Sequence, residues 1–277
     1  MPSIATSCTS KNYSDSKAMK DIFDTKRFGK YFSYELNTVR QNCGLTLLVT
    51  CAMPLIYVLL ELLFTADVNV NGDSVGFRWF LAIIALAITV MSFPVKLYGN
   101  ITERRAGSWW ALIPVSRFEK FLSIFLMTCV VLPICFFGLY SAVDALICLI
   151  SGYGEPLVKQ YFNLGDNVAG YFDGFSSFSL FVEFWLNWCG AILTFTLGSI
   201  FFKKGKVSKT ILVIIAFGFL MSSIAVWSMD GKTLDDWAGL SSNEFLSRMH
   251  TIQYMIYIVT DVLLLVGIFF RIKTIKY

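Results

Sequence analysis

Residues 103–121, ERRAGSWWALIPVSRFEKF, form a basic, tryptophan-bearing connector between two long hydrophobic segments. Gly107 weakens any helix that reaches it, and Pro114 disfavours helical geometry in the residue before it. Ser116 and Glu119 have the S-x-x-E spacing of a capping box and stand directly ahead of a long apolar segment. The pattern therefore predicts that one helix ends near Gly107 and that a new one begins after Ser116.

The composition of the chain is that of an all-α integral membrane protein. Hydrophobic residues make up 56% of the 277 residues and charged residues only 15%, and the mean hydropathy is +0.64; a soluble domain is much more polar. The seven cysteines show no C-x-x-C spacing, and there is a single histidine. A disulfide framework and a metal site are therefore not expected.

Six apolar segments have the length of about 20 residues that a helix needs to cross a bilayer. They lie at Leu45–Phe64, Trp79–Leu97, Phe121–Leu146, Phe178–Phe202, Thr210–Ser228 and Thr251–Phe270. The sequence thus predicts a six-span transmembrane domain over residues 45–270, followed by a short tail at 271–277. The first three segments contain Pro54, Pro94 and Pro133, which predict kinks.

The residues before the first span are predicted to form two parts. Residues 1–23 are polar, lack a signal-peptide pattern and are expected to be a disordered tail, with Met19 an alternative start to Met1. In residues 24–42, apolar side chains recur at three- and four-residue spacing among basic ones. This is typical of an amphipathic helix lying in the membrane interface, with a plain cytoplasmic helix as the alternative.

The distribution of Lys and Arg predicts the orientation. The segments before span one, between spans two and three, between spans four and five, and after span six contain 7, 4, 4 and 3 of them, or 18. The opposite connections contain four: Arg78, Lys159, Lys232 and Arg248. By the positive-inside rule both termini are cytoplasmic, in the inner membrane of the cell. The excess positive charge describes this orientation, and no nucleic-acid partner is expected.

The connector resembles a loop of known membrane proteins. Its pattern E-R-R-x-G-S-W-x-x-L-I-P-V-S-R-x-E-K-F is similar to the cytoplasmic loop between spans two and three in permease subunits of the ATP-binding-cassette type-2 exporter family. The resemblance implies a permease that moves an unidentified substrate out of the cytoplasm. It also implies a partner ATPase subunit docked on residues 99–121 and a second permease subunit, in a homodimer or heterodimer.

Different residues of the connector are assigned different roles. The resemblance implies an ATPase-docking surface made of Arg104, Arg105, Gly107, Trp109, Trp110, Pro114 and Arg117, while Ser116 and Glu119 cap the third span. Two alternatives remain. The connector could be an interfacial turn with membrane-belt tryptophans, or the chain could be a non-transporting sensor or scaffold whose loop binds another cytoplasmic partner.

The chain is not expected to be an enzyme. Gly231-Lys232-Thr233 lacks the first glycine of a phosphate-binding loop, because Val226 stands in its place. No zinc-protease or nucleophile-elbow motif is present in the sequence. No cofactor is expected on this chain, and ATP and Mg would be bound by the partner ATPase.

Four acidic residues in the spans are candidates for a transport path: Asp261, Asp144, Glu183 and Glu61. The last three fall toward the outer ends of their spans, where solvation at the interface is the simpler expectation. Asp261 is near the middle of the sixth segment, where a charge costs about 2.5–3.5 kcal/mol. It is expected to face the bundle interior, either hydrogen-bonded by Thr, Ser or Tyr of a neighbouring helix or lining the path.

Overall fold

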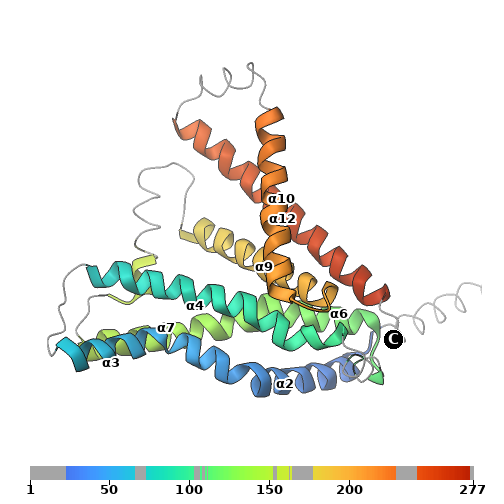
Figure 1. The fold of residues 1–277 in the computed structure, drawn as a ribbon, viewed down its shortest axis with the longest axis horizontal. Coiled ribbons are helices and arrows are strands. Elements are labelled where there is room, and N and C mark those ends of the chain that lie inside the picture. Colours follow the sequence, from blue (N-terminus) through green and yellow to red (C-terminus); the bar gives the residue numbers. More distant parts are fainter. Residues whose placement is uncertain are drawn as a thin grey trace, which may run out of the picture.

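The computed structural model describes residues 23–65, 73–102, 107, 110, 112–151, 155–161, 163, 177–228 and 242–274. This part of the chain is helical and contains no β-strand. Figure 1 shows α2, α3, α4 and α7 lying side by side, whereas α10 projects away from them. The predicted all-α class is therefore confirmed for the described residues.

The first helix, α2, covers Thr25–Cys51, and α3 covers Met53–Thr65. Asp24 caps α2 by accepting a hydrogen bond from the Lys26 N–H at 2.9 Å. The interfacial helix was expected to end at residue 42, but α2 continues through Gly44 into the apolar segment. The axis bends by 40° between the two helices, next to Pro54, whose missing N–H interrupts the backbone ladder.

The second predicted span corresponds to α4, Asp73–Tyr98, which is followed by the short 3-10 helix η1, Gly99–Thr102. Pro94 lies inside α4 without ending it. The third predicted span begins with α6, Arg117–Leu126, passes through the π-helical segment η2, Met127–Val131, and continues as α7, Leu132–Ser151. Pro133 lies two residues after the end of η2 and cannot donate a backbone hydrogen bond, which explains why the irregular turn is there.

The last three predicted spans correspond to α9, Ser177–Phe201, α10, Lys206–Ser228, and α12, Ser242–Thr274. A four-residue turn joins α9 to α10, and Gly205 adopts a positive φ of 64° in it. Glycine adopts this conformation without a steric penalty. The turn also contains Lys203 and Lys204 and ends where α10 begins at Lys206.

Five helices of the described residues are long and apolar enough to cross a membrane, and six if the bent pair α2 and α3 forms one span. Several apolar helices of this length are compatible with a multi-pass membrane protein. Along α10, nearly every described side chain from Leu212 to Ser223 is exposed. Such a surface would be costly in water and suits contact with lipid.

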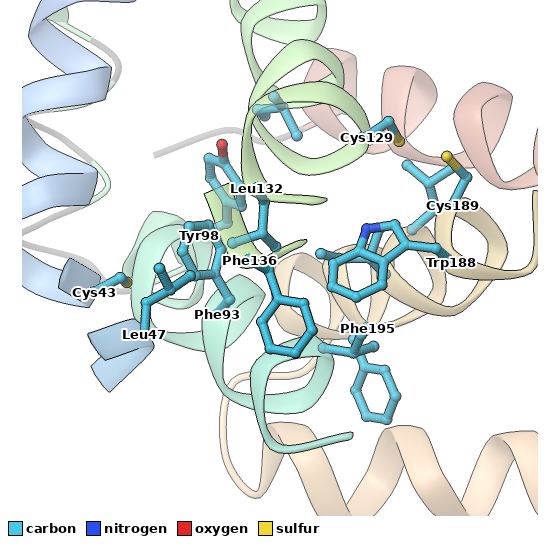
Figure 2. Packing of buried hydrophobic residues seen from close by; sticks show 14 of the residues in the cluster. Cys43, Leu47, Phe93, Tyr98, Cys129, Leu132, Phe136, Trp188, Cys189 and Phe195 are labelled. Carbon is cyan, nitrogen blue, oxygen red and sulfur yellow. The ribbon is translucent and has the colours of Figure 1, made fainter. Parts of the chain in front are cut away.

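The main core lies where α4, α7 and α9 pack together. Phe136 of α7 contacts Trp188 of α9 with ring centroids 5.6 Å apart, and Figure 2 shows Leu132 and Phe93 around them. Ile192 and Ile200 of α9 are completely buried. This core holds α9 in the middle of the bundle, between α4 on one side and α12 on the other.

Candidate functional site

One end of the molecule gathers most of the basic connections. The start of α2 is bound to α6 through Arg27 and Glu119, and the start of α10 is bound to η1 through Lys206, whose Nζ donates to the Gly99 carbonyl at 2.6 Å. The end of α12 lies at the same end of the molecule, because the Arg271 guanidinium is 5.2 Å from the centre of the Phe201 ring at the end of α9. We call this the basic end; it contains the connector.

The predicted capping box is present at the basic end. The Glu119 N–H donates to Ser116 Oγ at 3.2 Å, and the Ser116 N–H donates to Glu119 Oε2 at 3.0 Å. Both bonds satisfy backbone groups that the first turn of a helix leaves without partners. The capping box therefore fixes the connector to the first turn of α6, where the third predicted span begins.

Glu119 also binds the first helix, a contact that the sequence pattern did not indicate. Its Oε1 accepts the Asp24 N–H at 2.8 Å and Arg27 Nη2 at 2.9 Å, and its Oε2 accepts Arg27 Nε at 3.0 Å. The carboxylate is fully buried, while the Arg27 side chain is 35% exposed. One carboxylate thus joins the starts of α2 and α6, which are more than 90 residues apart in sequence. We call this contact the Glu119 junction.

Trp110 is held partly inside the protein. Lys120 Nζ donates to the Trp110 carbonyl at 2.8 Å and lies 4.4 Å from the centre of its indole ring, a cation–π distance. The indole also packs against the core cluster. Half-buried Trp110 therefore has an internal role besides any role in docking.

The other connector residues fall into three groups. Pro114 and Arg117 are exposed, whereas Gly107 is buried. Arg104, Arg105 and Trp109 lie outside the described residues. Sequence reasoning did not single out Leu112 and Phe118, which are 74% and 42% exposed. In the sequence, the signal that could have identified them is their position as apolar residues beside a charged turn.

Asp144 is not solvated, contrary to the expectation for an acid near the outer end of a span. It is 1% exposed and accepts hydrogen bonds from Arg78 Nη2 at 2.5 Å and Nε at 3.1 Å. Its other oxygen accepts the Leu157 N–H at 2.7 Å. The buried ion pair connects α4, α7 and the segment after α7, at the end opposite the basic one. The carboxylate could be buried only because Arg78, counted among the outer cations, faces inward.

Glu183 links α9 to α12. It accepts a hydrogen bond from Gln253 Nε2 at 2.7 Å, and its Oε2 lies 3.2 Å from His250 Nε2. The side chain is 23% exposed, which fits a partly solvated position. Glu61 lies in α3, and its side chain is outside the described part of the structure.

Asp261 faces the bundle interior, as predicted for an acid in the middle of a span. It is 8% exposed, and its Oδ1 lies so near Gly190 of α9 that a Cβ there would be only 2.9 Å away. Among the described residues, Oδ1 has no hydrogen-bond partner. The expected Thr, Ser or Tyr donor is therefore not present for this oxygen. The Cys129 and Cys189 thiols, adjacent in Figure 2, lie close by.

The described residues contain no group of three or more His, Cys, Asp or Glu side chains arranged to hold a metal ion. No protein-family model, curated protein or solved structure matches this chain. The functional assignment therefore depends on the connector, the Glu119 junction and the acids of the spans.

Proposed function

We propose that this chain is a transmembrane permease subunit of an ATP-driven exporter. In this proposal a separate ATPase subunit docks on the connector and its flanks, residues 99–121. Two permease subunits, identical or different, pair in the inner membrane and move a substrate out of the cytoplasm. The basic end faces the cytoplasm, and the first half of α2 lies along that surface of the membrane.

The Glu119 junction is the observation that carries the proposal. A subunit that uses ATP bound elsewhere needs a rigid connection from its docking surface into the membrane. Glu119 provides one, because it fixes the connector to α6 through the capping box and to α2 through Arg27 and Asp24. A displacement of the connector would therefore move two helices together.

The exposed residues of the connector support a protein partner. Leu112 and Phe118 present apolar surface at the basic end, with the Arg117 guanidinium between them in sequence. Large apolar side chains dominate binding when a partner buries them, and arginines on the rim fix the orientation. Together with the predicted contributions of Arg104, Arg105 and Trp109, this surface suits a partner with an apolar pocket and acidic rim.

Co-purification of the ATPase subunit with the tagged chain tests the proposal. We expect Trp109→Ala/Trp110→Ala to weaken the complex by at least about 2 kcal/mol, or roughly 30-fold. Leu112→Ala should weaken it without affecting the fold, since this side chain is 74% exposed. Lys159→Ala is the matched surface control, because Lys159 is exposed near the opposite end.

Two outcomes would contradict the proposal. If no ATP-binding subunit co-purifies with the parent chain, the sensor or scaffold alternative becomes the better account. If the ATPase is retained at the parent level by both the double-alanine and the Leu112→Ala variants, the connector is an interfacial turn and docking takes place elsewhere.

A further inference from the structure

An open cavity of about 650 Å³ lies at the basic end, between α2, the end of α4 and the connector. Its volume is within the range of small-molecule sites, about 300–1,000 Å³. Its lining includes Arg27, Lys30, Tyr31 and Glu35 of α2, and Tyr98 at the end of α4. Arg27 is also bound to Glu119, so the α2 wall of the cavity is connected to α6.

The lining of the cavity changes in polarity along α2. Arg27 and Lys30 stand near the start of the helix, Glu35 lies two turns further, and Val39 continues the same face. Arg27, Tyr31, Glu35 and Val39 follow one another at spacings of four residues, which keeps their side chains on one side of the helix. Leu97 and Ile101 add apolar surface from α4 and η1. The cavity therefore offers cations at one end and apolar walls at the other, as an amphiphile requires.

Two buried polar groups stand between these regions. The Tyr98 side chain is 3% exposed, and its hydroxyl has no hydrogen-bond partner among the described residues. Glu35 is 9% exposed and accepts hydrogen bonds from the Tyr31 and Ser123 hydroxyls. A buried hydroxyl without a partner is costly. A ligand carrying hydroxyl or ester oxygens would satisfy it.

We propose that the cavity binds the headgroup and glycerol of an anionic phospholipid from the leaflet at the basic end. The phosphate pairs with Lys30, a headgroup hydroxyl donates to the Glu35 carboxylate, and an ester oxygen accepts from the Tyr98 hydroxyl. The acyl chains leave along the apolar walls. This inference depends on the cavity and does not require that an ATPase docks on the connector.

The charge of α2 favours an anionic lipid over a zwitterionic one. Four cations, Lys26, Arg27, Lys30 and Arg40, against the single carboxylate Glu35 leave the helix with a net charge of +3. Basic segments at a membrane surface attract anionic headgroups, and each Lys or Arg near the surface adds to the attraction. Further along α2, Leu45 and Leu48 are 76% and 59% exposed, so the helix enters a lipid-facing region just beyond the cavity.

Binding of defined lipids by the purified full-length chain tests the inference. Native mass spectrometry would titrate dioleoylphosphatidylglycerol, dioleoylphosphatidylcholine with the same chains, and soluble sn-glycerol 1-phosphate. We expect one phosphatidylglycerol to bind at least tenfold more tightly than phosphatidylcholine, and glycerol phosphate alone to bind far more weakly. Equal affinity for the two lipids would overturn the proposal, and equal affinity for glycerol phosphate would show a soluble phosphate ester to be the ligand.

Three variants separate the cavity from surface charge. Lys30→Gln should weaken phosphatidylglycerol binding about fivefold, and Tyr98→Phe should do so by a similar factor while retaining the fold, since the lost hydroxyl has no partner. Lys26→Gln, which removes an exposed cation of α2 outside the cavity, should change it less than twofold. If Lys26→Gln weakens binding as much as Lys30→Gln, or Tyr98→Phe has no effect, the lipid is attracted only to the basic surface.

Discussion

Removal of the Glu119 carboxylate should detach the start of α2 from the start of α6. In Glu119→Ala, the Asp24 and Ser116 N–H groups and the Arg27 guanidinium all lose their acceptor. Asp24 is exposed and Ser116 is half-buried, so water can replace part of each bond, at about 1 kcal/mol each. Arg27 is 35% exposed, which limits its contribution to about 1 kcal/mol.

Of these bonds, only those of Asp24 and Arg27 cross from α2 to α6. They sum to about 2 kcal/mol, which corresponds to an increase of roughly 30-fold in the opening equilibrium of the junction. Hydrogen exchange of the amides in the first two turns of α2, measured in lipid nanodiscs, reports that equilibrium directly. Arg27→Ala should have a smaller effect of about fivefold, because Glu119 would still accept the Asp24 N–H.

Arg117→Ala is the matched control, since Arg117 is an exposed cation only two residues from Glu119. It should leave exchange in α2 unchanged. If Glu119→Ala increases exchange no more than Arg27→Ala does, the Asp24 backbone bond contributes nothing to the junction. The junction would then be a simple surface ion pair, and rigid transmission from the connector to α2 would lose its basis.

Three further changes test other parts of the structure. Asp144→Asn should lower the free energy of unfolding by about 3–5 kcal/mol, because it leaves the buried Arg78 guanidinium without its counter-ion. Thermal unfolding in detergent measures this loss. If the double variant Arg78→Met/Asp144→Leu does not recover most of it, the ion-pair explanation is contradicted. Asp261→Asn should unfold at or above the parent temperature, because Oδ1 has no donor to lose, while ATP-driven transport falls; unchanged transport would exclude a role for the acid. Lys204→Cys should react with a membrane-impermeant thiol reagent only from the cytoplasmic side, and labelling from outside would reverse the proposed orientation.

Much of the helical framework follows from local sequence. Apolar segments of about 20 residues can satisfy their backbone groups in lipid only as helices, so length and composition predicted the positions of the spans. The Ser116–Glu119 box was equally predictable, because both of its bonds join residues three positions apart. Pro54 and Pro133 indicated the bend after α2 and the irregular turn at η2, since a missing N–H acts on the residues next to it.

The partners of the charged residues were decided only by the tertiary structure. Glu119 meets Arg27 across 92 positions and Asp144 meets Arg78 across 66, separations over which sequence spacing contains no information about contact. Local pattern assigned Glu119 a capping role and Asp144 a solvated one. In the folded protein Glu119 also binds α2, and Asp144 is buried together with its counter-ion Arg78. A charge removed from water needs such a partner, and only the folded chain brings that partner close.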